Sequence, residues 1–227
     1  MPIQPKINWR DFFLIPNIFS ILRILLTPFI AYSISIDTTE GILTSVTLLA
    51  IAGITDYFDG YFARRLNKIT TLGLILDPVA DKILTITLIV ELIFYRGFPL
   101  WFAIAVIARD LIIMLTGLMI LRRRRISLPS NLTGKYYFSA IAILIFSHIV
   151  RFPFGQMIFL VIGIILLVFS SINYARVFYL ASQGRELPVF HDKPILKWSR
   201  VMLMLIILMV SLYKCYLEVF IYYIQGG

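Results

Sequence analysis

Four aspartates stand in two pairs within residues 54–82 of a largely apolar chain. Asp56 and Asp59 are three residues apart, and Asp77 and Asp81 are four apart. On a helix, both spacings place the two members of a pair on one face. Because a short loop would join the two helices as antiparallel neighbours, we expect the four carboxylates to converge at one depth.

A cluster of this kind needs a cation beside it. Four carboxylates at the edge of an apolar helix pair repel one another and lose solvation. Hard oxygen ligands with no His or Cys nearby suit Mg²⁺ or Mn²⁺, and four carboxylates are enough for two ions. Two such ions would hold a diphosphate and stabilise both the attacking and the leaving oxygen of a displacement.

Two other interpretations compete with phosphate chemistry. The aspartates could be helix caps and salt-bridge partners of nearby Arg and Lys, or the ion site of a cation channel or transporter. The residues between the pairs favour the phosphate interpretation. Gly60, Ala63 and Gly73 are small and allow close approach of a ligand or backbone, and Arg64 offers a planar guanidinium suited to phosphate.

The elements that must position these residues are membrane helices. Of the 227 residues, 60% are apolar, which leaves too little polar surface for a water-soluble globule. At about 20 residues per span, this length predicts an all-α polytopic bundle with about six or seven helices. The apolar segments expected to form them are 13–36, 41–63, 73–95, 98–121, 134–151, 153–181 and 198–224.

The net charge of +9 predicts the orientation of the bundle. With the N-terminus inside, the cytoplasmic connections receive most of the basic residues, including the run 122–125, whereas the outer ones receive Arg96 and Arg151 beside Asp37 and Glu40. The aspartates then face the cytoplasm. No soluble basic domain is present to bind nucleic acid. The single cysteine, Cys215, excludes an internal disulfide, and the first segment is expected to be a retained helix.

The sequence predicts three parts. Residues 1–183 form the transmembrane domain, 184–197 a cytoplasmic linker, and 198–224 an additional C-terminal hydrophobic helix. That last segment either spans the membrane or lies partly in the interface, because Lys214 and Glu218 are spaced to pair on one helix face.

The string D-x2-D-G-x2-A-R-x8-G-x3-D-x3-D resembles the signature of the CDP-alcohol phosphotransferase family. All eight fixed positions match, namely Asp56, Asp59, Gly60, Ala63, Arg64, Gly73, Asp77 and Asp81. The resemblance runs from the first helix to about residue 180. It includes the PNIFSILR stretch, with Asn17 and Arg23, and the IARD stretch, with Arg109.

The resemblance implies a six-helix core with its active site open to the cytoplasm of a bacterial inner membrane, and a homodimer. An acceptor hydroxyl would attack the β-phosphorus of a CDP-linked donor, and CMP would leave. By motif position, Asp56, Asp59, Asp77 and Asp81 would bind the metal ions, and Asp81 would also be the general base. The implied donor-site residues are Gly60, Ala63, Arg64, Thr70, Gly73, Asn17 and Arg23.

Within that family, the strings DYFDGYFARR and LDPVADK resemble the phosphatidylglycerophosphate synthases. This implies transfer of the phosphatidyl group of CDP-diacylglycerol to sn-glycerol 3-phosphate, a step of phosphatidylglycerol biosynthesis. The phosphate of that acceptor needs basic partners. The candidates are Arg109, Lys135 and Arg176.

Some positions depart from that branch. Its Gly-Lys-x-Lys-Thr motif reads GKYYF here, so Lys135 is kept while Tyr137 and Phe138 replace Lys and Thr. Ser20 stands where Thr is common, and the pair Arg109-Asp110 also occurs in eukaryotic-type cardiolipin synthases. Cardiolipin synthesis, or another acceptor such as an inositol or an amino alcohol, therefore stays open.

Overall fold

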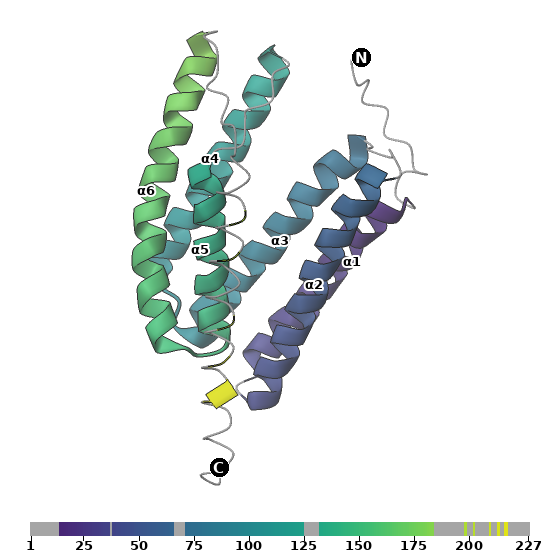
Figure 1. Ribbon diagram of the computed structural model, residues 1–227, viewed down its shortest axis with the longest axis vertical. Helices are drawn as coiled ribbons and strands as arrows, with labels where there is room; N and C mark the ends of the chain where they lie inside the picture. Colours follow the sequence, from purple (N-terminus) through teal and green to yellow (C-terminus); the bar gives the residue numbers. More distant parts are fainter. Residues whose placement is uncertain are drawn as a thin grey trace. The chain divides into compact units, whose positions relative to one another are not determined.

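The computed structural model describes residues 14–36, 38–65, 71–124 and 132–183, with isolated positions at 198, 202, 209, 213, 216 and 217. Its described elements are all helices (Figure 1). They are α1 (Ile15–Ser35), α2 (Thr39–Arg65), α3 (Thr71–Arg96), α4 (Leu100–Arg124), α5 (Leu132–Ile149) and α6 (Pro153–Gln183). They belong to two compact units, Met1–Gly97 and Phe98–Gly227.

These helices coincide with the first six predicted segments, so the prediction of an all-α membrane protein is confirmed. Three of the described helical stretches are long and apolar enough to cross a membrane, namely Asn17–Ser35, Leu132–Ile149 and Pro153–Gln183. Helices α2 and α3 carry the four predicted aspartates, and the other predicted charged site residues lie on α1, α2, α4, α5 and α6. The predicted linker 184–197 lies outside the described residues, as does the predicted helix 198–224 apart from the isolated positions.

In the first unit, α1 packs against both α2 and α3. Its polar side chains recur at Asn17, Ser20, Arg23 and Thr27, and all four are buried. In a membrane helix, polar side chains face the protein rather than lipid, because unpaired polar groups in hydrocarbon are costly. This polar stripe therefore marks the face that α1 turns toward its neighbours.

At the other end of α1, hydrogen bonds connect it to α2 and to α3. The Ser33 and Ser45 hydroxyls are 2.8 Å apart and join α1 to α2. Arg96, in the last turn of α3, donates to the carbonyls of Ile34 at 3.1 Å and Ile36 at 3.3 Å. Carbonyls at a helix C-terminus have no partner within the helix, so a guanidinium is a suitable cap.

In the second unit, α6 packs against α5 and α4. The α5–α6 connection is tight. Arg151 has a positive φ of 55°, and the Phe152 amide donates to the Ser147 carbonyl at 2.8 Å. A Cβ on Gly155 would lie 2.6 Å from the Ser147 hydroxyl oxygen, so a glycine is needed for this close approach.

Candidate active site

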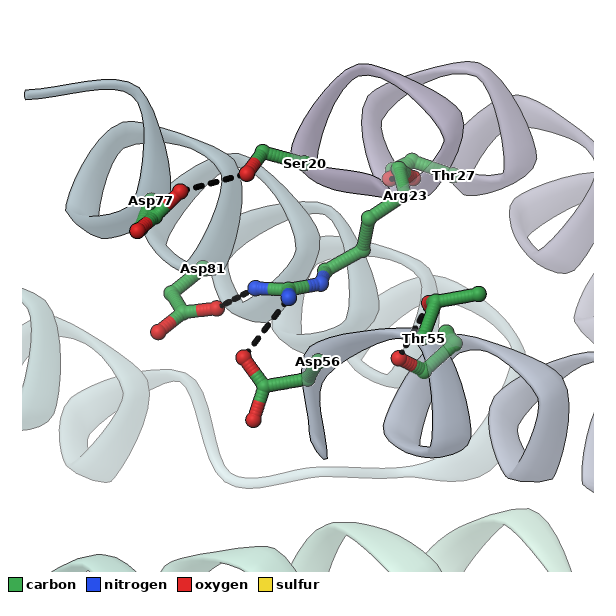
Figure 2. A network of polar contacts seen from close by, with 8 residues as sticks. Ser20, Arg23, Thr27, Thr55, Asp56, Asp77 and Asp81 are labelled. Carbon is green, nitrogen blue, oxygen red and sulfur yellow. Dashed lines mark hydrogen bonds and ion pairs between the residues drawn. The ribbon is translucent and has the colours of Figure 1, made fainter. Parts of the chain in front are cut away.

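Arg23 joins two of the predicted aspartates, one on each of the helices that pack on α1. Its Nη2 atom lies 2.6 Å from Oδ1 of Asp56 on α2, and its Nη1 atom donates to Oδ1 of Asp81 on α3. Figure 2 shows the side chain reaching from α1 to both carboxylates. One guanidinium on α1 therefore brings the two carboxylates together. A planar guanidinium with several donors in fixed directions suits this task better than a lysine would.

Asp77 is held from the same face of α1. The Ser20 hydroxyl donates to Oδ1 of Asp77, one turn of helix before Arg23 (Figure 2). Ser20 is fully buried, so its hydroxyl needs a partner. Three of the four predicted aspartates thus lie around one short stretch of α1.

The two ends of the ion pairs differ in exposure. The Arg23 side chain is 1% exposed, whereas those of Asp56 and Asp81 are 57% and 48% exposed. The Arg23 guanidinium lies on the buried side of the two carboxylates, and the carboxylates are about half exposed. This arrangement keeps carboxylate oxygens accessible to a ligand while their positions are fixed from behind.

Several predicted site residues have no described side chain. Asp59, Gly60, Ala63 and Arg64 lie on α2 with Asp56, but their side chains are outside the described part of the structure, and Thr70 lies outside the described residues altogether. Asn17 and Gly73 are described and buried, in α1 and α3. The predicted contacts of these residues with a CDP donor stay predictions.

The donor chemistry of this site fits a hard divalent cation. Within the described ranges, no group of three or more His, Cys, Asp or Glu side chains is arranged to hold a metal ion. The predicted set also includes Asp59, whose side chain is not described. Asp56 and Asp81 already meet at one cation, the guanidinium, and both offer hard oxygen atoms partly exposed to solvent. Such oxygens are the ligands that Mg²⁺ and Mn²⁺ prefer.

A second polar cluster lies in the other unit and is centred on Arg109 of α4. Its Nη1 atom donates to Oδ1 of Asp110 at 2.8 Å, and its Nη2 atom donates to the Ser170 hydroxyl on α6. The guanidinium carbon lies 4.3 Å from the ring centroid of Tyr137 on α5 and 5.2 Å from that of Tyr174 on α6. We refer to Arg109, Asp110, Tyr137, Ser170 and Tyr174 as the Arg109 cluster.

The three predicted acceptor-phosphate residues differ in their surroundings. The Arg109 side chain is largely buried, at 13% exposed, within the cluster named for it. Lys135 on α5 and Arg176 on α6 are exposed. An enclosed guanidinium can orient a ligand, and exposed cations can attract one, so the two kinds of residue suit different steps of binding.

Comparison with known proteins identifies the class. Residues 13–170 match the family model of the CDP-alcohol phosphatidyltransferases. This match covers well over half of the chain, so the chain belongs to the CDP-alcohol phosphatidyltransferase family, a family of membrane enzymes that generally use a divalent metal. The predicted reaction class is thereby confirmed at the level of the family. Membership favours the enzyme over the ion-transport and salt-bridge interpretations.

Individual relatives carry two different names. The CDP-diacylglycerol–glycerol-3-phosphate 3-phosphatidyltransferase of Haemophilus influenzae is 33% identical over 175 residues, which is 73% of this chain and 93% of the relative. The protein of that name in Aquifex aeolicus is 34% identical over 125 residues, 54% of this chain and 67% of the relative. The cardiolipin synthase (CMP-forming) of Streptomyces coelicolor is 35% identical over 126 residues, 53% of this chain and 58% of the relative.

Sequence reasoning did not anticipate how α1 arranges the site. Arg23 was expected at the donor, whereas the structure gives it two ion pairs with aspartates, and Ser20 was noted only as a substitution. The spacing of Asn17, Ser20, Arg23 and Thr27, at intervals of three and four residues, is the signal for a buried polar face on an apolar helix. Tyr137 was noted only as a replacement within the Gly-Lys-x-Lys-Thr motif, and Ser170 and Tyr174 had no signal, because aromatic and small polar residues are common in membrane helices.

Proposed function

We propose that the chain transfers the phosphatidyl group of CDP-diacylglycerol to a hydroxyl of sn-glycerol 3-phosphate and releases CMP. One observation carries the proposal: Asp56, Asp77 and Asp81, from two helices, are held around Ser20 and Arg23 of α1 in a chain of this family. The proposed donor residues belong to the first unit and the acceptor candidates to the second.

The donor side rests on the signature residues of α2 and α3. Asp56, Asp59, Asp77 and Asp81 would hold two Mg²⁺ or Mn²⁺ ions. When bound, these ions would neutralise the diphosphate of the donor and the negative charge that develops on it. Arg64 would pair with a donor phosphate oxygen, and Gly60, Ala63, Thr70 and Gly73 would let the nucleotide approach the helices closely.

Asp81 would act as the general base. As the acceptor oxygen forms its bond to the β-phosphorus, the hydroxyl proton passes to the Asp81 carboxylate, and the bond between the β-phosphorus and the oxygen of CMP breaks with its electron pair. Arg23 would orient this carboxylate through Oδ1, because the guanidinium is itself fixed by Asp56 on another helix. Ser20 would orient Asp77 in the same way.

The choice of glycerol 3-phosphate as acceptor is supported by the similarity to the Haemophilus influenzae protein, which extends over nearly the whole of that relative. Arg109, Lys135 and Arg176 would bind the acceptor phosphate. Lys135 and Arg176 are exposed and would attract the anion, and Arg109 would fix its orientation.

Phosphatidylglycerol is the second candidate acceptor, which would make the product cardiolipin. It is supported by the similarity to the Streptomyces coelicolor protein and by the Arg109 cluster itself. The Asp110 carboxylate lies against the Arg109 guanidinium, and a pair without net charge suits a singly charged phosphodiester better than a doubly charged phosphomonoester.

An acceptor panel tests this proposal. The purified protein in mixed micelles with Mg²⁺ and CDP-diacylglycerol is expected to release CMP with sn-glycerol 3-phosphate and to form phosphatidylglycerophosphate. CMP release with phosphatidylglycerol alone would favour the second candidate, and CMP release with inositol phosphate alone would contradict both proposed acceptors. No CMP release with any acceptor contradicts the proposed activity.

Removal of divalent cations is expected to stop the reaction. Excess EDTA should reduce CMP release to the level without protein, because four crowded carboxylates cannot bind a diphosphate unless a cation neutralises them. Addition of Mg²⁺ or Mn²⁺ beyond the chelator should restore the rate, and K⁺ at equal ionic strength should not. Full activity in EDTA would contradict the proposed role of the aspartates.

The remaining expectations also stand as proposals. We propose that the N-terminus and the aspartate cluster face the cytoplasm of a bacterial inner membrane, that the catalytic domain comprises residues 1–183, and that the protein is a homodimer. The support for the orientation is the excess of Lys and Arg in the connections assigned to the inside.

A further inference from the structure

The Arg109 cluster contains two buried polar atoms that have no hydrogen-bond partner among the residues that the structure describes. They are Nε of Arg109 and the hydroxyl oxygen of Tyr137. Tyr137 is only 2% exposed. An enclosed hydroxyl without a partner is destabilising, and in native proteins such a group is rare enough to require a reason.

The rest of the guanidinium is already held. Asp110 binds Nη1, Ser170 binds Nη2, and the rings of Tyr137 and Tyr174 lie within cation–π distance. These contacts come from α4, α5 and α6. They fix the plane of the guanidinium and leave only Nε of its polar atoms without a hydrogen bond inside the described unit.

The chemistry of the two remaining atoms limits what can satisfy them. The Nε–H group only donates, so its partner must be an acceptor. A phenol hydroxyl can donate to the same kind of atom, and an anionic oxygen beside a guanidinium forms the stronger, charge-assisted hydrogen bonds. The phosphate oxygen of a glycerol phosphate group fits both donors.

We propose that Tyr137 is a specificity-determining residue of the acceptor site, whose ring positions Arg109 and whose hydroxyl donates a hydrogen bond to a phosphate oxygen of the acceptor. This inference rests on the proposed function. It applies to glycerol 3-phosphate and to the head group of phosphatidylglycerol alike, because both carry a glycerol joined to a phosphate.

Tyr137 lies near the start of α5. It lies five residues after Leu132, the first residue of α5, which is about 7.5 Å along the helix. Gly134 lies between Leu132 and Tyr137 on α5, and a Cβ there would lie 3.1 Å from the Tyr174 hydroxyl oxygen, so its small size leaves room for the Tyr174 side chain.

The decisive variant is Tyr137→Phe, which removes the hydroxyl and keeps the ring over Arg109. We expect the KM for the acceptor to rise by about 10- to 100-fold, the loss expected for one hydrogen bond to a charged group, with kcat and the KM for CDP-diacylglycerol unchanged. The matched control is Tyr136→Phe, which makes the same change at the adjacent, exposed position of α5. Separate assays with glycerol 3-phosphate and with phosphatidylglycerol show which of the two acceptors receives the hydrogen bond from the Tyr137 hydroxyl.

A binding measurement separates this inference from the proposed reaction. With Mg²⁺ present and CDP-diacylglycerol absent, glycerol 3-phosphate or phosphatidylglycerol should raise the Tm of the wild type and of Tyr136→Phe, but raise that of Tyr137→Phe far less. If no acceptor supports CMP release, the reaction proposal fails while this shift still tests Tyr137. Wild-type behaviour of Tyr137→Phe in both measurements, or no Tm shift of the wild type with either ligand, overturns the inference and leaves Tyr137 a packing residue.

Discussion

Replacement of Asp81 by asparagine is expected to reduce CMP release by about 10²- to 10⁴-fold, the usual contribution of a general base. Asparagine keeps the size of the side chain and can still accept the hydrogen bond from Arg23, but it cannot take the proton of the acceptor hydroxyl. The measurement is the initial rate of CMP release at saturating donor, acceptor and Mg²⁺. The Tm in detergent should change little, because the buried Arg23 guanidinium keeps its ion pair with Asp56 and a hydrogen bond to the amide oxygen.

The matched control is Glu91→Gln. Glu91 lies on the same helix, α3, ten residues after Asp81, and the variant makes the same exchange of a carboxylate for an amide. It should retain the wild-type rate. If Asp81→Asn kept more than about a tenth of the wild-type rate, another group would have to accept the proton, and the assignment of the base would be wrong.

The helices could be predicted from sequence because membrane spans are defined by composition and length. The six segments found from apolar residues match α1 to α6 within a few residues. The deviations are largest where charged residues continue a helix beyond its apolar part. Helix α4, for example, runs on to Arg124, past the predicted end at 121, because a helix that leaves the membrane no longer needs apolar side chains.

The aspartates of the site could be predicted, but the way in which they are held could not. Their spacing placed Asp56 on one helix and Asp77 and Asp81 on the next, and the structure gathers these three residues around α1. The sequence pattern gave no means of choosing which cation lies between them. The two ion pairs of Arg23 follow from the packing of α1 against α2 and α3, which the spacing of the aspartates does not predict.

Replacement of Arg23 by methionine is expected to reduce both stability and turnover. Loss of one partner from a buried ion pair costs about 3–5 kcal/mol when the remaining charge stays buried. Here the remaining carboxylates of Asp56 and Asp81 are about half exposed and can be hydrated, so we expect the smaller value of about 1–3 kcal/mol. Turnover should fall at least about tenfold, because Asp81 loses the contact that orients it.

The control for Arg23 is Arg96→Met, in the same unit. Arg96 donates to two backbone carbonyls at the end of α1 and to neither aspartate in the contacts described. This variant should lose stability without a comparable loss of turnover among the molecules that remain folded. Equal losses of turnover in the two variants would mean that Arg23 acts only through the stability of the fold.

A double-mutant cycle decides whether Arg23 acts through its ion pairs. Combining Arg23→Met with Asp56→Asn should show a coupling of about 0.5–3 kcal/mol in the free energy of unfolding, the range found for residues in direct contact. The Arg23→Met and Glu91→Gln pair should show coupling near zero. If Arg23 and Asp56 were also uncoupled, the 2.6 Å contact would not contribute to stability, and α1 would hold the aspartates through packing alone. Coupling in turnover as well as stability would show that the same contact positions the reacting groups, because residues that act as a unit lose their function together.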